Sequence, residues 1–281
     1  MSEPRIAALN VYPVKSCRGI ARDRAHVTLR GLAIDGAADR EWMIVDRNRR
    51  FVTQREFPRL ALVGTALEPG FLVLTAPEQA PVAVPTSATA GAPRQVLVWQ
   101  STVAAYDAGD EAADWISVFL GVDVRLVRFD PAAQRLCNPE FAGDSGAHTA
   151  FADGYPVLVI GEASLAELNA RLAQQHSPAL PMNRFRPNVV VIGLDAHEED
   201  HLDTLSACGV VLKLVKPCTR CQITTTDQDT ANVGVEPLRT LGGYRNDPRL
   251  GGVTFGMNAI VVAGAGRELV AGESMSMTYR F

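Results

Sequence analysis

Short extended segments rich in Val and Ile recur along the whole chain. Most are bounded by Gly, Pro or Asp, which is the pattern of β-strands that end in turns. Strands this short and this numerous favour twisted sheets or barrels. The candidates are Ile6–Val14, Trp42–Asp46, Leu60–Ala66, Phe71–Thr75, Gln95–Trp99, Val124–Phe129, Val157–Ile160, Asn188–Ile192, Val210–Val215 and Asn258–Ala263.

Two stretches have helical periodicity instead. In residues 110–120 the apolar side chains recur at helical spacing, and Gly121 can close the end. In residues 164–174, Ser164 and Glu167 have the spacing of a capping box at the start of a helix. The sequence therefore predicts a mainly β protein with a few helices, of the α+β class.

Composition limits where the protein works and what it binds. The 281 residues are 47% hydrophobic and 21% charged with a net charge of −4, which is ordinary for a soluble globular protein and disfavours nucleic-acid binding. The five widely spaced cysteines fit a reducing compartment. No apolar run approaches the ~20 residues of a membrane helix, and residues 1–5 lack the apolar core of a signal peptide. We therefore expect a cytoplasmic protein that binds neither nucleic acid nor membrane.

The run KPCTRCQITTTD, residues 216–227, concentrates the most chemistry. It contains two thiols, a guanidinium and a row of hydroxyls. A thiolate binds soft or redox-active metals, and the planar fork of an Arg suits phosphate. These groups together favour a metal carried on an anionic, phosphate-bearing organic ligand.

Other interpretations of this run stay open. A CxxC pair can be half of a zinc site, a redox dithiol, or two unrelated cysteines. A zinc site would have to recruit scattered residues, because the chain has no second CxxC. A thioredoxin-type dithiol opens a helix, whereas the β-branched residues 223–226 favour an extended chain.

Three further segments place basic side chains at the ends of predicted strands. Residues 15–19, KSCRG, could cradle a phosphate. Arg40 precedes one apolar strand, and Arg186 and Asn188 stand at the start of another. Taken alone, a solvated or salt-bridged strand end is the preferred explanation of each.

The segment 197–201, HEEDH, fits the HExxH signature of zinc metalloproteases. That mechanism needs a half-buried helix, but the interior of this one would be acidic. A solvated acidic loop is the preferred interpretation, and a zinc hydrolase that uses His197 and His201 is kept as an alternative.

Together the separated segments resemble the MOSC-domain molybdenum proteins with an N-terminal β-barrel domain, the family that includes the mitochondrial amidoxime-reducing component and its bacterial relatives. The matching segments follow one another along the chain. They are YPVKSC (12–17), DREW (39–42), FADGYP (151–156), GEASL (161–165), FRPN (185–188), CTRC (218–221), EPL (236–238) and FG (255–256). The resemblance implies a MOSC N-terminal β-barrel-like domain over residues 5–122, packed with a MOSC β-barrel domain over residues 123–281 that carries the metal ligand.

The resemblance also implies a molybdenum–molybdopterin cofactor. Its metal would be bound by Cys221, which is then both the metal ligand and the catalytic residue, while Cys218 is a neighbour. The residues implied to hold the cofactor are Lys15, Ser16, Arg40, Arg186, Asn188, Thr219, Arg220 and Cys221. The chain stops at Phe281 without a further cysteine-rich segment, so no iron–sulfur cluster is expected in it.

The implied activity is the reduction of N-hydroxylated or otherwise N-oxygenated small molecules, a detoxification reaction. A separate flavin reductase, ferredoxin or cytochrome b5-like protein would supply the electrons. The alternative is a non-catalytic carrier of molybdenum cofactor or sulfur, because the same domain occurs in cofactor sulfurases and a fold does not fix a function.

Overall fold

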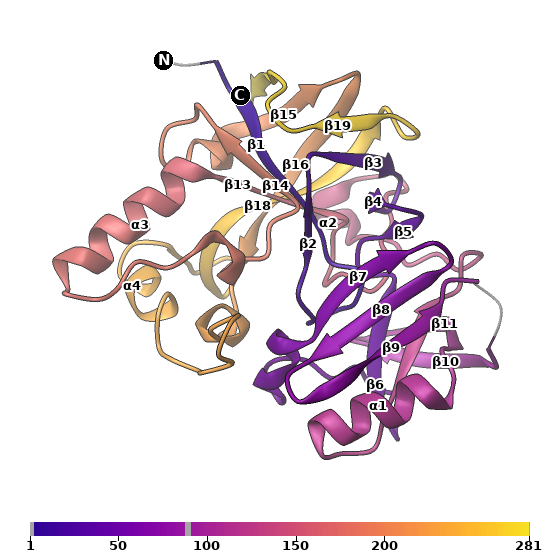
Figure 1. The fold of residues 1–281 in the computed structure, drawn as a ribbon. Helices are drawn as coiled ribbons and strands as arrows, with labels where there is room; N and C mark the ends of the chain where they lie inside the picture. The colour runs from indigo at the N-terminus through magenta and orange to yellow at the C-terminus, as the bar shows by residue number, and fades with distance from the viewer. Residues whose placement is uncertain (1–2, 88–90, 281) are drawn as a thin grey trace.

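The structure, a computed structural model, describes residues 3–87 and 91–280 and is built mainly of β-strands with a few helices (Figure 1). The predicted fold class is confirmed. The strands of the described residues form four sheets, of nine, four, four and three strands. Within the same residues, none of the helices combines the length and the apolar character needed to cross a membrane.

The nine-stranded sheet forms the half of the molecule that carries the CTRC segment. Its strands follow the order β2-β1-β14-β13-β18-β16-β15-β20, and β17 pairs with β18 beside this path. Their bounds are β1 (Arg5–Val11), β2 (Ile20–Arg22), β13 (Val157–Gly161), β14 (Val189–Ile192), β15 (Leu202–Ala207), β16 (Val210–Thr219), β17 (Asn246–Asp247), β18 (Gly252–Ala263) and β20 (Ser276–Tyr279). The parallel strands β13 and β14 are joined through α3 (Glu162–Gln174), and every residue of β13 is buried.

Two of the other sheets build the second half, at the lower right of Figure 1. One has the order β10 (Pro93–Val98), β11 (Ser101–Asp107), β12 (Val124–Phe129), β6 (Trp42–Asp46), and another contains β7 (Gly64–Glu68), β8 (Phe71–Ala76) and β9 (Gln79–Pro85). The third sheet, of β19 (Glu268–Val270), β3 (Arg24–Thr28), β4 (Gly31–Ile34) and β5 (Ala37–Ala38), shares a hydrophobic core with the nine-stranded sheet. Helix α1 (Asp110–Leu120) buries one apolar face in the core of the half that contains β8 and β9 and ends at Gly121 with φ +72°, as predicted.

Short helices complete the fold. They are η1 (Pro58–Leu62), α2 (Pro139–Ala142), η2 (Met182–Arg184), η3 (Glu198–His201), η4 (Gln222–Thr225) and α4 (Leu238–Gly242). Two of them, η2 and η4, flank the segments that carry Arg186 and Cys221.

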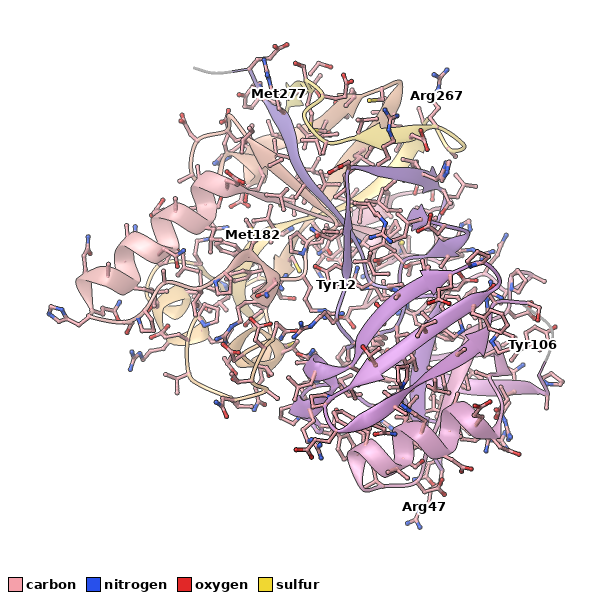
Figure 2. All side chains as sticks on the ribbon, in the orientation of Figure 1. Tyr12, Arg47, Tyr106, Met182, Arg267 and Met277 are labelled. Carbon is pink, nitrogen blue, oxygen red and sulfur yellow. The ribbon has the colours of Figure 1, made fainter. Side chains whose placement is uncertain are left out.

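The two predicted domains, residues 5–122 and 123–281, exchange strands. β1 and β2 pair within the nine-stranded sheet, whereas β12 pairs with β6 and β11 in the other half. The division at residues 122 and 123 therefore stays a prediction, and backbone hydrogen bonds cross it in both directions. Figure 2 places Tyr12, which follows β1 directly, between the two halves.

The start of α3 differs from the prediction. The helix begins at Glu162 with Gly161 as its N-cap, so the predicted capping box at Ser164 is wrong. The Ser164 hydroxyl is buried and has a tertiary partner instead, the carboxylate of Glu199, with Oγ 2.7 Å from Oε2. Ser164 also accepts the backbone N–H of His197 at 2.8 Å.

The acidic segment 197–201 is also not the solvated loop that was predicted. It forms η3, in which Glu199 is fully buried and accepts the backbone N–H of Gly161 at 3.1 Å. Asp200 forms an ion pair with Arg245. Local composition cannot reveal such partners, because they come from distant parts of the chain.

The buried Glu199 makes stability depend on pH. Burial raises the pKa of this carboxyl, and the hydrogen bonds from Ser164 and Gly161 only partly oppose that effect. A carboxyl whose pKa is higher in the folded than in the unfolded state stabilises the fold at low pH, and this contribution is lost as the pH rises through the folded pKa. The neutral variant Glu199→Gln should therefore gain stability relative to the wild type as the pH rises above the ordinary pKa of a glutamate. Denaturant midpoints of both proteins measure this, with the exposed Glu68→Gln as the control. A difference between Glu199→Gln and wild type that stays constant with pH would contradict the prediction.

Candidate active site

One cavity brings together segments that lie far apart in the sequence. Its lining consists of Lys15, Ser16, Arg40, Ala152, Asp153, Gly154, Tyr155, Leu158, Phe185, Arg186, Asn188, Cys218, Thr219, Arg220, Cys221, Ile223, Thr224 and Asn258. All eight residues predicted to bind the cofactor are among them. The structure thus places the whole predicted set in one pocket, while the role of each residue stays a prediction.

Backbone strain is concentrated in this lining. Ser16, Arg40 and Arg186 have φ values of +69°, +49° and +57°, a region that residues with a side chain rarely adopt. Each such residue costs roughly 1–3 kcal/mol and persists only where its surroundings hold it. The three lie in three different segments, so the pocket is held in shape from several sides.

Asp39 is the buried centre of the hydrogen-bond network behind the pocket. Its carboxylate is 1% exposed and accepts the backbone N–H of Tyr12 at 2.9 Å and the side-chain amide of Asn188 at 2.9 Å. It also forms an ion pair with Arg40. Asp39 thereby joins the end of β1, the start of β14 and the turn before β6.

Asn188 is saturated by protein partners. Its Nδ2 donates to Asp39 and to the carbonyl of Asn10, and its Oδ1 accepts from the backbone of Leu158 at 3.1 Å and from Arg40 at 3.2 Å. An amide has two donors and two acceptor positions, so none remains open. In this arrangement Asn188 holds Arg40 in place.

The two arginines behind the pocket differ in their pairing. Both guanidiniums lie 4.3 Å from the centre of the Tyr12 ring, but only Arg40 has a carboxylate partner. Arg186 is 8% exposed, has no ion pair within the described residues, and leaves Nη2 without a hydrogen-bond partner. Burial, followed by the neighbouring charge of Arg40, lowers the pKa of Arg186 to about 10. A buried cation without a counter-charge indicates a place for an anion.

The two cysteines of the CTRC segment have different surroundings. Arg220 donates to the sulfur of Cys218 at 3.0 Å and to the carbonyl of Phe185 at 2.6 Å. Cys221 is half-buried and precedes η4, and its carbonyl accepts the backbone N–H and the hydroxyl of Thr224. Within the described part of the chain, the Cys221 sulfur has no hydrogen bond, so it is the thiol that remains available in the pocket.

The loop that includes Asp153 forms another wall. The buried Lys15 ammonium donates to the carbonyl of Phe151 at 2.9 Å and to Asp153 at 2.6 Å. Burial lowers the pKa of Lys15, and the charge of Asp153 opposes this. Desolvation by neighbouring protein atoms would raise the pKa of Asp153, although its side chain is partly open to solvent, but the charges of Lys15 and Arg40 outweigh this effect and hold that pKa well below its usual range.

Sequence reasoning missed Arg135. This buried side chain donates to the carbonyls of Ala150, Ala152 and Asp153 and so fixes the loop. Nothing in its own neighbourhood of the sequence indicates this, because an isolated Arg in a loop has no distinguishing pattern. The match at residues 151–156 pointed to the loop but not to what holds it.

The zinc alternative finds no support in the geometry. Within residues 3–87 and 91–280, no group of three or more His, Cys, Asp or Glu is placed to hold a metal ion. His201 is exposed, whereas the ring of His197 packs against Tyr244 and Phe255.

Two family models match successive parts of the chain. The family model of the MOSC N-terminal beta barrel domain matches residues 3–123, and that of the MOSC domain matches residues 146–275. The chain is 37% identical over 245 residues to mitochondrial amidoxime reducing component 2 of Bos taurus, covering 85% of this chain and 72% of that protein. It is 36% identical over 250 residues to mitochondrial amidoxime-reducing component 1 of Homo sapiens, covering 86% and 73%.

These relatives contradict the prediction of a cytoplasmic location, because they are named mitochondrial. The prediction was wrong for a chemical reason. Composition and cysteine usage separate reducing from oxidising surroundings, but they do not separate one reducing compartment from another.

Both domains are matched in order, and the similarity extends over most of this chain and most of its relatives. The chain belongs to the family of MOSC-domain proteins with an N-terminal MOSC barrel that includes the mitochondrial amidoxime-reducing components.

Proposed function

We propose that this protein is a molybdenum-cofactor-dependent oxidoreductase that reduces N-hydroxylated and other N-oxygenated small molecules. The names of its relatives support the reaction class. The observation that carries the proposal is a pocket in which the available thiol of Cys221 lies with the unpaired, buried guanidinium of Arg186.

The residues present fit the cofactor that the family implies. Molybdopterin carries a phosphate, and Arg186 has a buried Nη2 that finds no hydrogen-bond partner among residues 3–87 and 91–280. Arg220 has no carboxylate partner within the described residues, so it adds a second uncompensated charge to the pocket. A thiolate is a suitable ligand for a redox-active metal, which is the role we assign to Cys221.

The remaining predicted residues complete the binding site. Lys15 uses two of its three N–H donors on protein oxygens, which leaves one for a ligand in the pocket. Arg40 supplies positive charge that Asp39 partly neutralises, and Asn188 keeps it in position. Ser16 and Thr219 bring hydroxyl groups to the same lining.

When bound, the cofactor supplies the two-electron chemistry at its metal, and the protein supplies binding, orientation and charge. Reduction of an N–OH group to N–H releases water and consumes protons, so a polar pocket with a buried ammonium suits it. We also propose that the chain holds no iron–sulfur cluster. A separate flavin reductase, ferredoxin or cytochrome b5-like protein would then deliver the electrons, and the reaction would serve detoxification.

Removing the proposed metal ligand tests the function. Loss of an outer-shell partner typically weakens metal binding 10–100-fold, so Cys221→Ser should lower molybdenum content by more than about tenfold. Metal analysis of protein from a molybdenum-replete host measures this, and oxidation of a reductant in the presence of an amidoxime measures turnover. Cys218→Ser is the matched control and should keep most of its molybdenum.

Two outcomes would count against the proposal. Full molybdenum content in Cys221→Ser would show that the ligand is misassigned. Cofactor binding without any reduction of an N-oxygenated compound would favour the non-catalytic carrier instead.

The unpaired Arg186 predicts a conflict between stability and binding. Arg186→Met removes a buried charge that has no partner in the protein, so cofactor-free protein should be stabilised by about 1–4 kcal/mol. The same variant should bind less cofactor. Arg184→Met is the matched control, because Arg184 donates to the carbonyl of Thr225 and to Asp227. It should be destabilised by about 1–3 kcal/mol.

Thermal unfolding of both variants, produced in a host that cannot make the cofactor, measures the stability change. Molybdenum content after production in a competent host measures binding. If Arg186→Met destabilises the cofactor-free protein as much as Arg184→Met does, then Arg186 is a structural residue and the anion site is wrong.

A further inference from the structure

The β10–β11 hairpin has an unusual residue at its turn. Val98 pairs with Ser101, so Trp99 and Gln100 form a two-residue connection, and Trp99 has φ +55°. Such turns favour Asn, Asp or Gly, and a bulky side chain at positive φ is an outlier that its surroundings must hold. The geometry of the turn therefore does not explain why a tryptophan occupies this position.

Three contacts hold the indole in place. Its Nε1 donates to Oδ1 of Asp153 at 3.2 Å, its ring lies 5.0 Å from that of Phe51, and the Arg55 guanidinium lies 4.7 Å from the indole centre. Asp153 and Phe51 come from different segments, so these contacts fix the hairpin to two other parts of the chain. Within the described residues, Arg55 has no carboxylate partner, which leaves its charge beside the ring.

These contacts place the indole at the mouth of the pocket. Asp153 lines the pocket, and its Oδ1 also accepts from Lys15 inside it. The Asp153 side chain is 67% exposed, so it lies where the pocket opens to solvent. Trp99 is 44% exposed and lies beside Asp153, just outside the lining. The chain has three tryptophans, and the other two, Trp42 and Trp115, are buried.

We propose that Trp99, with Phe51 and Arg55, forms an aromatic shelf that binds a planar aryl group of the substrate and determines specificity. This inference rests on the proposed function. The pocket lining includes the cationic side chains of Lys15, Arg40, Arg186 and Arg220, which suit the cofactor and the N–OH end of the substrate. A substituent that extends past Asp153 then meets the indole, whose π-face favours flat aromatic groups over aliphatic ones.

Matched substrates and variants test the shelf in the molybdenum-loaded protein. Benzamidoxime and acetamidoxime share the reacting group but differ in the aryl ring. Trp99→Gly removes the indole and suits positive φ, so folding is not expected to suffer. It should raise KM for benzamidoxime roughly 3- to 10-fold, with kcat and the acetamidoxime constants nearly unchanged. Trp99→Phe keeps a ring but loses the N–H donor to Asp153, and it should keep most of the aryl preference.

A second measurement needs no turnover. Benzamidoxime should quench the emission of the exposed Trp99 in the loaded wild-type protein, and Trp99→Phe should lose this signal. The shelf would be overturned if Trp99→Gly changed KM equally for both substrates, or not at all, and benzamidoxime did not quench the wild-type emission. The reductase assignment would remain intact in that case. If the wild type reduces neither compound, the proposed function fails, and the quenching titration alone decides whether Trp99 contacts an aryl ligand.

Discussion

The arrangement of the pocket depends on the buried carboxylate of Asp39. It neutralises Arg40 and orients the Asn188 amide, and it fixes the chain at Tyr12 between the two halves. Arg186 lies on the same Tyr12 ring and receives no such partner. The charge of Arg40 is therefore partly compensated within the protein, whereas that of Arg186 is left for an anion. This asymmetry gives the pocket its net attraction for a phosphate-bearing ligand.

The loop that carries Cys221 is held from both halves of the molecule. Arg184, on the side of the nine-stranded sheet, binds the carbonyl of Thr225 and the carboxylate of Asp227. From the other half, the buried amide of Gln54 exchanges two hydrogen bonds, of 3.1 and 3.0 Å, with the amide of Gln228 in this loop. Residues 12–19, which connect β1 to β2, also bind the other half, because the backbone N–H of Lys15 donates to the carbonyl of Trp42 at 2.8 Å.

Most predicted strands are present in the structure, because β-branched runs between turn residues depend on local chemistry. The predicted strand Leu60–Ala66 is wrong at its start, where the chain forms η1 before it enters β7. The pocket was different. An Arg at the end of a strand has the same local pattern whether it is paired, as Arg40 is, or unpaired, as Arg186 is. The resemblance to a family identified these positions, and the periodicity alone did not. The same limit applies to three other side chains whose partners are distant in the chain. Ser164 binds Glu199, Arg135 binds the loop 150–153, and Trp99 binds Asp153.

The strained residues explain how the site is prepared for its ligand. Ser16, Arg40 and Arg186 line the pocket at positive φ, and Trp99 stands at its mouth in the same conformation. Roughly 1–3 kcal/mol of strain at each position is offset by hydrogen bonds and packing formed during folding. The groups that meet the ligand are then already ordered, so binding does not have to supply that ordering free energy. The pocket is thus preorganised at the cost of some stability of the ligand-free state. The unpaired charge of Arg186 likewise lowers the stability of that state and favours binding of an anion.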